Sequence, residues 1–237
     1  MNLRIRSRSR ALGVSSLVLA AALTFSACGS TAVVTVSAKA QLATVKLNAV
    51  KQKYVLATLL EMSHGQTIQQ TGALSINQGA QKIVSGSDQM IVVYIGGLLY
   101  VQASKGFLYG IFHLTTAQSI KQAGKWALVS KTNAAYNNVL AGVTIPLAMS
   151  EFKFGARDKL TLGPVKQLNG NSTTSLIQQV HKTDVSAGGI ETYYLSASRP
   201  HLLVEVDAKS SAFSSKLTFT KWGKKFNITA PTPTWQI

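Results

Sequence analysis

The sequence predicts an α+β fold: a strongly curved antiparallel β-sheet, or half-barrel, with helices packed in its concave face around an apolar cavity. Three observations support this prediction. About ten runs of β-forming residues follow one another, most of them separated by short turns, as in an antiparallel meander. One helical segment precedes these runs, and short helical segments interrupt them midway. A sheet of that size, wrapped around a few short helices, encloses more space than ordinary side chains readily fill.

The first 27 residues have the pattern of a bacterial lipoprotein signal peptide. Four arginines within the first ten residues precede an uncharged apolar run, and small residues then lead to a cysteine. Ser26, Ala27 and Cys28 match the lipobox, whereas Phe25 stands where leucine is usual. The apolar run is shorter than the roughly 20 residues that cross a bilayer. A plain secretory signal with an incidental cysteine is the alternative interpretation.

Cys28 is the single cysteine of the chain and the predicted site of lipidation. A diacylglyceryl group on its sulfur would supply two acyl chains, and two chains anchor a protein stably where one holds marginally. We therefore expect residues 1–27 to be removed and residues 28–36 to form the lipidated cysteine and a short tether. The mature protein would then be lipid-anchored at the cell membrane, on its extracytoplasmic side.

Residues 37–237 are predicted to form a single domain, since no charge block, proline run or composition shift divides them. The chain has 24 Lys and Arg against 8 Asp and Glu, a formal net charge of +16. Its basic residues are scattered singly rather than gathered in a stripe, so the charge does not predict nucleic-acid binding. A basic surface could face anionic lipid headgroups, or it could serve solubility alone.

Periodicity and turn chemistry place the elements. Residues 37–52 have near-helical apolar spacing with Ser37 as N-cap, and residues 53–62 favour a strand that is apolar on both faces. Gly96-Gly97 and Asn169-Gly170 predict two-residue hairpin turns between β-rich runs. The other predicted strands cover 67–76, 81–85, 90–95, 98–102, 125–130, 159–168, 172–180, 191–196, 201–207, 213–220 and 225–229, and short helices cover 115–122 and 133–142.

Prolines and a tryptophan complete this assignment. Residues 145–154 are apolar, and Pro146 in a first turn favours a helix there. Trp222 is predicted at a strand end, with its indole packed under the turn. Pro231 and Pro233 are predicted to end the ordered part of the chain.

The sequence contains no recognisable catalytic or metal-binding pattern. Its four histidines lie far apart without a second ligand at metal spacing, and its eight acidic residues form no close pair for acid–base catalysis. The neighbouring Ser63 and His64 do not indicate a catalytic serine with its base, because a nucleophile triad is assembled from separate segments. We therefore predict a protein that is not an enzyme and holds no metal or cofactor. A hydrolase, the alternative, would need His181 or His201 beside a serine and a carboxylate.

Four stretches of the predicted domain carry a resemblance to a known family. They are the hairpin at 92–101, Gly124-Lys125-Trp126 before a strand, residues 193–206, and residues 217–231, which match most closely. In order and spacing they resemble the LppX/LprAFG-type lipoproteins of mycobacteria and related actinobacteria. The resemblance implies a half-barrel similar to the LolA/LolB carriers, with an apolar cavity for acylated lipids or glycolipids. It also implies that such lipids are bound or moved across the envelope without chemistry.

An empty cavity of lipid size would cost more free energy than the usual stability of a fold, so we expect the cavity to hold a ligand, to contain water or to be partly collapsed. Its lining should come from the first strands and the apolar mid-chain segment. A register slip of one residue would turn each strand's side chains to the other face. The predicted lining residues are Leu56, Leu60, Val92, Tyr94, Leu140, Val143, Ile145 and Leu147.

Taken together, these features predict a membrane-anchored extracytoplasmic lipoprotein that binds and carries or presents an acylated lipid or glycolipid. Its expected partners are that lipid, the outer leaflet of the cytoplasmic membrane through Cys28, and envelope lipid-export machinery, with no nucleic acid. The alternative is an accessory or sensor lipoprotein with the same fold and a filled core, which acts through protein–protein contacts.

Overall fold

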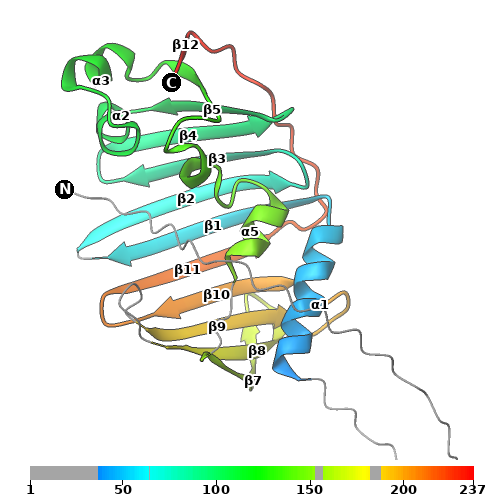
Figure 1. Cartoon of the computed structure of the whole chain (residues 1–237). Coiled ribbons are helices and arrows are strands. Elements are labelled where there is room, and N and C mark those ends of the chain that lie inside the picture. The colour runs from blue at the N-terminus through cyan, green and yellow to red at the C-terminus, as the bar shows by residue number, and fades with distance from the viewer. Residues whose placement is uncertain (1–36, 64, 153–156, 182–187) are drawn as a thin grey trace, which may run out of the picture.

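The computed structural model describes residues 37–63, 65–152, 157–181 and 188–237 of the chain. Within these ranges twelve strands form one sheet, and five helices accompany it (Figure 1). The sheet is large, open and antiparallel apart from its shortest strand, which confirms the predicted half-barrel class. The predicted signal peptide, the lipobox with Cys28 and the tether lie outside the described residues.

The strands follow one another across the sheet in the order β12-β6-β5-β4-β3-β2-β1-β11-β10-β9-β8-β7. Chain neighbours pair as antiparallel hairpins or meanders in most of this order. The pairing of β1 with β11 joins the early strands to the late ones in the middle of the sheet. The strands are β1 (Tyr54–Ser63), β2 (Gln66–Ser75), β3 (Gly79–Ser85), β4 (Asp88–Ile95), β5 (Leu98–Ala103), β6 (Trp126–Val129), β7 (Lys159–Leu168), β8 (Asn171–Val180), β9 (Gly189–Ser196), β10 (Leu203–Lys209), β11 (Phe213–Thr220) and β12 (Trp235–Gln236).

The helices divide between the two halves of the sheet. In Figure 1, α1 and α5 lie near the β1 and β8–β11 half, and α2 and α3 lie beside β4 and β5. All but α2 were predicted from the sequence. The helices are α1 (Ala38–Lys51), α2 (Lys105–Phe112), α3 (Thr116–Gln122), α4 (Tyr136–Leu140) and α5 (Ile145–Glu151).

Local turn and cap chemistry accounts for several boundaries. Gly96 and Gly97, with φ of 60° and 80°, form the turn between β4 and β5, because glycine adopts positive φ without steric cost. Asn169 and Gly170 form the turn between β7 and β8 in the same way, with φ of 51° and 77°. The Ser37 hydroxyl accepts a hydrogen bond from the first turn of α1 and caps it. These three predictions are confirmed.

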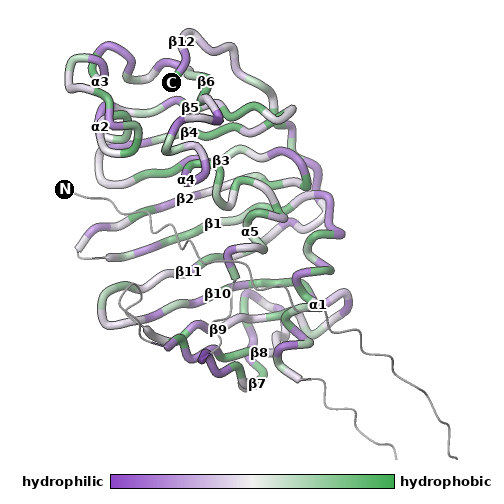
Figure 2. Tube along the Cα trace, viewed as in Figure 1, coloured by the Kyte–Doolittle hydropathy of each residue, from purple (hydrophilic) through white to green (hydrophobic). Residues whose placement is uncertain are grey.

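Two core clusters lie on the inner face, which we define as the face of the sheet that the helices cover. The lower cluster joins α1 and α5 to β1, β2 and β8–β11, and Leu42, Val45 and Ala49 bring one side of α1 into it. Along α1, hydrophobic and hydrophilic residues alternate in Figure 2, as expected for a helix with one buried side. The upper cluster joins α2 and α4 to β4–β6 and includes Val92, Val101, Phe107, Val129 and Val139.

A third, smaller cluster lies on the opposite, outer face and covers strands β4 and β5. Val93 and Tyr100 project there from the sheet, and Ile228 and Phe226 of the C-terminal segment pack against them. The segment after β11 therefore crosses the outer face as extended chain, as the red trace in Figure 1 shows. The predicted strand at 225–229 is wrong, since these residues pack by their side chains without joining a ladder.

The C-terminal residues beyond Pro233 are ordered, which contradicts the prediction that the two prolines end the ordered part. Strand β12 pairs in parallel with β6. The Ile237 amide donates to the carbonyl of Leu128 at 3.0 Å, and the Ser130 amide donates to the carbonyl of Ile237 at 2.8 Å. Proline removes a backbone donor only at its own position, so pairing can resume two residues later.

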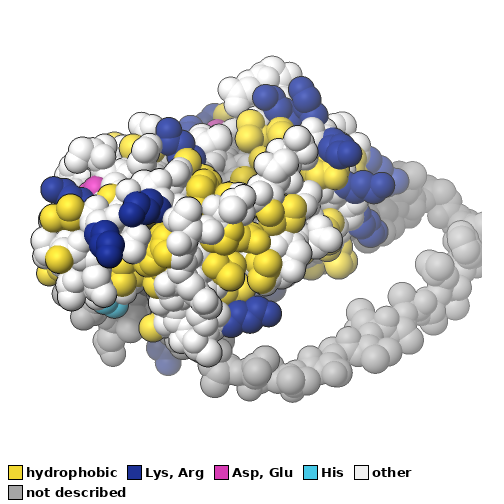
Figure 3. Space-filling view, turned by 90° about the horizontal axis from the view of Figure 1, so that it is seen from above, with side chains coloured by type: hydrophobic (Ala, Val, Ile, Leu, Met, Phe, Trp, Pro, Cys, Tyr) yellow, Lys and Arg dark blue, Asp and Glu magenta, His cyan; other side chains and the backbone are white. Residues whose placement is uncertain are grey.

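Basic side chains are spread over the surface. Figure 3, which views the molecule from the β12 end, shows Lys and Arg among hydrophobic and neutral polar side chains, with Asp and Glu much rarer. In the described ranges, no helix is long and apolar enough to span a membrane. The same residues contain no group of three or more His, Cys, Asp or Glu side chains that could hold a metal ion.

Candidate functional site

The pairing of β1 decides which of its apolar side chains face the helices. Val55 pairs with Leu74, and both are buried in the lower cluster. Because side chains alternate along a strand, Leu56 and Leu60 point to the outer face, where Leu60 is 40% exposed. The prediction that Leu56 and Leu60 line the inner concavity is therefore wrong, by a shift of one residue.

The other predicted lining residues lie on or under the inner face, divided between the two clusters. Val92 and Val143 are fully buried in the upper cluster, and Tyr94 and Leu140 are partly buried against it. Ile145 is fully buried in the lower cluster instead. Leu147, on α5, is half-buried. That these six residues contact a lipid stays a prediction.

The segment between α4 and α5 is held tightly against β3. The Gln81 side-chain amide, which is buried, donates a 2.7 Å hydrogen bond to the carbonyl oxygen of Gly142. Gly79 lies so close that a Cβ placed on it would be 1.7 Å from the carbonyl oxygen of Val143. This part of the inner face is therefore filled by the protein's own backbone.

The space between α1 and the sheet is filled as well. Leu42 and Val45 on the helix and Val55 on β1 are exposed by 1% or less. Phe152 packs edge-to-face on Tyr193, with ring centroids 5.7 Å apart. The concavity beneath α1 is thus a close-packed core rather than a hollow.

A less covered row of side chains lies between the two clusters, on the inner face of β11, β1, β2 and β3. Leu59 pairs with Leu217 on one side and with Gln70 on the other, and Gln70 pairs with Ile83. All four side chains are half-buried. Ile68, two residues from Gln70 on the same face, is half-buried too. We call these five residues the inner strip.

The neighbouring row on the same strands shows why the inner strip stands out. Phe219, Ala57, Gly72 and Gln81 form that row, and each of them is buried. Leu217 packs against the lower cluster and Ile83 against the upper one, so the inner strip connects the two cores. Since adjacent strands lie about 4.8 Å apart, the row from β11 to β3 spans about 14 Å. The sequence indicated this row only indirectly, through the alternation of Leu217 and Phe219 with polar residues on β11.

A buried polar network lies at the β7–β9 end of the inner face. The Tyr193 hydroxyl lies within hydrogen-bonding distance of Gln178 Oε1, at 2.8 Å, and of Glu191 Oε2, at 2.6 Å. Gln178 Nε2 donates to Asp158 Oδ2 at 2.9 Å, and the His181 amide donates to Asp158 Oδ1 at 2.9 Å. Such bonds offset the cost of burying the tyrosine and glutamine, so the network has a structural role.

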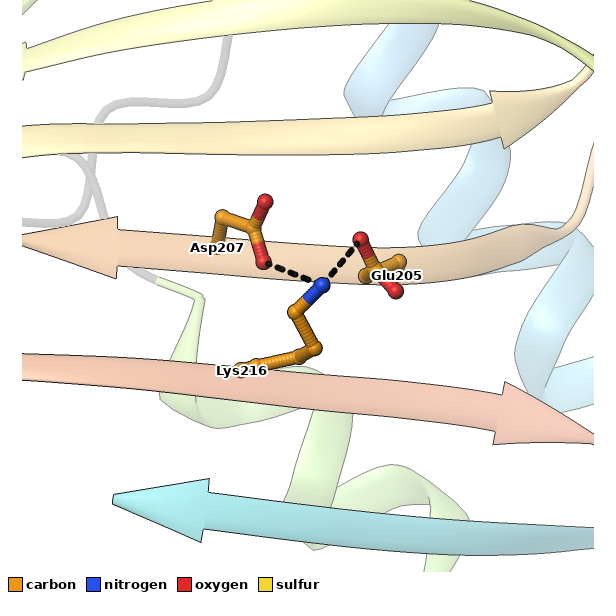
Figure 4. A network of polar contacts seen from close by, with 3 residues as sticks. All are labelled: Glu205, Asp207 and Lys216. Atoms are coloured by element: carbon orange, nitrogen blue, oxygen red, sulfur yellow. Dashed lines mark hydrogen bonds and ion pairs between the residues drawn. The ribbon is translucent and has the colours of Figure 1, made fainter. Parts of the chain in front are cut away.

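On the outer face, two carboxylates share one lysine (Figure 4). Lys216 Nζ lies 3.3 Å from Glu205 Oε1 and 3.8 Å from Asp207 Oδ1. Glu205 is buried, whereas the Lys216 side chain is 54% exposed. Burial lowers the pKa of Lys216, but its hydrogen bond to Glu205 and the charges of Asp207 and Glu205 raise that pKa by more, so the net shift is upward.

The histidines named for a hydrolase occupy structural positions. His201 Nδ1 lies 3.0 Å from the carbonyl oxygen of Ser196, and the Ser196 hydroxyl donates to the carbonyl of Ser198 at 3.0 Å. These contacts belong to one tight turn. The backbone amide of His181 is bound by Asp158, as described above. His64 lies outside the described residues.

Comparison with known proteins identifies a fold. No protein-family model matches the chain, and no curated protein matches it. Among solved structures, Mycobacterium tuberculosis lipoprotein LppX matches with a TM-score of 0.52 and 15% identity, over 81% of this chain and 99% of that one. LprF from Mycobacterium bovis matches with a TM-score of 0.50 and 10% identity, over 82% of this chain and 96% of that one. The LppX/LprF type of fold, expected from the resemblance in sequence, is thereby confirmed.

Proposed function

We propose that this protein is a membrane-anchored extracytoplasmic lipoprotein that binds an acylated lipid or glycolipid and carries or presents it. The observation that carries the proposal is the inner strip, a row of half-buried aliphatic side chains that joins two filled cores. The fold shared with two lipoproteins supports the same proposal. We place the ligand along the inner strip, with one acyl chain crossing strands β11 to β3.

Most of the binding free energy would come from burying the apolar surface of the ligand. Completing the burial of each partly exposed Leu or Ile contributes at most about 1 kcal/mol, and each methylene removed from water contributes about 0.8 kcal/mol. An acyl chain therefore brings more apolar free energy than the four aliphatic side chains of the strip. Gln70, in the middle of the row, offers both a donor and an acceptor to an ester or sugar oxygen.

The filled regions on either side limit how the ligand can bind. Among the described residues, the packing of α1 and the close contact of Gly79 with Val143 fill the regions beside the inner strip, whereas the strip itself stays partly accessible. We propose a surface groove of modest depth along the strip, in place of the enclosed cavity expected from the sequence. A second acyl chain would need α5 or the segment before it to move.

Membrane attachment is a separate part of the proposal and rests on the sequence of residues 1–28. Replacing Cys28 by alanine should abolish both the incorporation of radiolabelled fatty acid and the lipobox cleavage after Ala27. Replacing Phe25 by leucine should leave both unchanged, since it restores the usual lipobox residue. Incorporation of fatty acid into the Cys28→Ala protein would refute the anchor without touching the lipid-binding proposal.

Lipid binding is tested by mass spectrometry of a solvent extract from the purified full chain. We expect acylated lipid at a near-equimolar ratio to protein, and rebinding of that lipid to the extracted protein with a rise in melting temperature. A lipid-free protein without any lipid-dependent thermal shift would instead support the accessory or sensor function. The close-packed lower cluster is the observation that favours this second candidate.

A further inference from the structure

A pocket of about 350 Å³ opens on the outer face, at the end of strands β8–β11 that lies near the C-terminus of α1. Thr218 and Thr220 line it from the outer face, on the other side of the sheet from the inner strip, whereas Phe219 and Trp222 belong to the packing of the lower cluster. Its floor is apolar and less exposed, formed by Leu202, Val204, Phe219 and Trp222. Its volume lies at the lower end of the range of about 300–1,000 Å³ typical of small-molecule sites.

The pocket exists because β10 and β11 part from each other. Their pairing ends at Glu205 and Thr218, and a bulge at Val204 shifts the register of β10 against β9. Bulges re-aim side chains in this way next to functional sites. The indole of Trp222 closes the gap from behind, because its Nε1 donates a 2.9 Å hydrogen bond to the carbonyl of Leu203.

The rim of the pocket is exposed and positively charged. Arg199 and Lys221 stand on it, together with the neutral polar side chains of Asn171, Ser198 and Thr220. None of the residues that line the pocket is Asp or Glu. Within the described part of the chain, neither Arg199 nor Lys221 has an ion-pair partner. The site therefore presents uncompensated positive charge above an apolar floor.

The carboxylates next to the pocket on this face share a single lysine. Glu205 and Asp207 lie on β10 next to the pocket, and both contact the ammonium group of Lys216 (Figure 4). This group therefore keeps one net negative charge, which lowers the positive potential of Arg199 and Lys221 without cancelling it.

The turn that carries Arg199 is held by several hydrogen bonds. The Ser196 amide donates to the carbonyl of Leu202 at 2.8 Å, and the Leu202 amide donates to the Ser196 hydroxyl at 2.9 Å. The side-chain amide of Asn48, on α1, donates to the carbonyl of Pro200. A turn fixed in this way loses little conformational entropy when Arg199 binds a ligand.

The turn that carries Lys221 is anchored equally well. The Gly223 amide donates to the carbonyl of Tyr54 at 2.8 Å, and the Lys224 amide donates to the carbonyl of Lys221 at 3.1 Å. Trp222 stacks on Phe219 with ring centroids 5.7 Å apart. The two cations are thus presented by preorganised backbone from two different segments.

We propose that this pocket binds a phosphorylated amphiphile, with its phosphate at Arg199 and Lys221 and its apolar part on the floor. A guanidinium, an ammonium and several hydroxyl or amide donors suit an anion with three or more oxygens better than a carboxylate with two. The floor then distinguishes an amphiphile from free phosphate. This inference does not depend on lipid binding at the inner strip.

The test is isothermal titration calorimetry of the full chain with dihexanoyl phosphatidic acid, kept below its micelle concentration so that no membrane surface is present. We expect saturable one-to-one binding. Inorganic phosphate, which lacks the tails, and dihexanoyl phosphatidylcholine, whose head is zwitterionic, should each bind about tenfold or more weakly. Equal affinity for free phosphate would exclude a role for the floor, and equal affinity for phosphatidylcholine would exclude a role for the cations.

Matched variants locate the binding site. Arg199→Gln and Lys221→Gln should each weaken phosphatidic acid binding by about tenfold, whereas Lys82→Gln, which removes an exposed charge from β3, should change it by less than about twofold. An equal loss in Lys82→Gln would show that net charge alone attracts the ligand. Leu59→Gln should leave phosphatidic acid binding intact. If this variant lost the binding, the ligand would have to bind at the inner strip, and the proposal would be overturned.

Discussion

The side-chain amide of Gln81 donates a 2.7 Å hydrogen bond to the carbonyl oxygen of Gly142, 61 residues further along the chain. The bond fixes the segment between α4 and α5 to the middle of β3. That segment leads from Val143 in the upper cluster to Ile145 in the lower one, so the position of Gly142 helps to decide how much of the inner face is covered. The bond is therefore a point at which stability and access to the inner strip are coupled.

Gln81→Ala should lower the free energy of unfolding by about 2 kcal/mol, because it leaves a partly buried carbonyl without its donor and removes buried side-chain volume. Gln69→Ala, at an exposed position of the neighbouring strand β2, should cost less than about 0.5 kcal/mol. Urea unfolding of both variants measures the difference. Equal losses would mean that the Gln81 bond contributes nothing specific.

Gly79→Ala should destabilise the fold by about 1–3 kcal/mol, because the added methyl group meets the backbone of Val143. Gly110→Ala is the matched control, since Gly110 lies in α2 with open space around it. Alanine is the better helix former, so that variant should gain about 0.5–1 kcal/mol. Thermal and urea unfolding measure the change in stability of both variants. No change in Gly79→Ala would show that the segment around Val143 moves away freely.

Leu59→Gln and Leu60→Gln make the same chemical change on opposite faces of β1. Leu59→Gln should reduce the lipid recovered in a solvent extract severalfold, because it places an amide in the middle of the inner strip. Leu60→Gln should leave the recovered lipid unchanged. The measurement is the lipid-to-protein ratio by mass spectrometry, and equal ratios in both variants would contradict binding at the strip.

Lys216→Met should lower stability at neutral pH by about 1 kcal/mol, a value kept small because the lysine is half exposed. The pKa of Lys216 is raised in the folded state, so its stabilising effect is complete below its ordinary pKa of 10.5. The effect is then lost as the pH rises through the higher folded-state value. The difference between wild type and variant in urea unfolding should therefore shrink above pH 10.5. Lys209→Met, at an exposed position on the neighbouring strand β10, should show neither effect.

The sequence predicted those features of the fold that depend on local chemistry. The turns at Gly96-Gly97 and Asn169-Gly170 need residues that accept positive φ, and the cap at Ser37 needs a hydroxyl in one place. Each of these signals is confined to a few residues. α2 escaped prediction because Gly106 and Gly110 weaken its helix propensity, which packing against β4 and β5 then overrides.

The faces of the strands were harder to predict because pairing decides them. β1 is apolar at nearly every position, so its own pattern does not say whether Leu59 or Leu60 faces the helices. β11 does alternate, with Leu217 and Phe219 among polar residues, and its register against β1 turns Leu59 inward. The inner strip could have been found only by combining two strands that lie more than 150 residues apart in the chain.

The outer-face pocket had no local signal at all. It arises where a bulge at Val204 and the end of the β10–β11 pairing coincide, and both are tertiary features. The position of Trp222 under a strand-end turn was predicted and is confirmed by its stacking on Phe219. Its role as the back wall of a cationic pocket depends on Leu203 and Arg199, which the sequence does not connect to it.

The pairing of β12 with β6 occupies one border of the sheet, and Pro164 interrupts the border strand β7 at the other, where the register shifts. Neither edge of the sheet thus offers a long uninterrupted row of free amides and carbonyls to a strand of another molecule. Copies of the chain at high local density are therefore less prone to pair edge to edge into fibrous aggregates. A purification tag fused directly after Ile237 would disturb the hydrogen bonds that hold Ile237 beside β6, so a tag is better placed elsewhere on the chain.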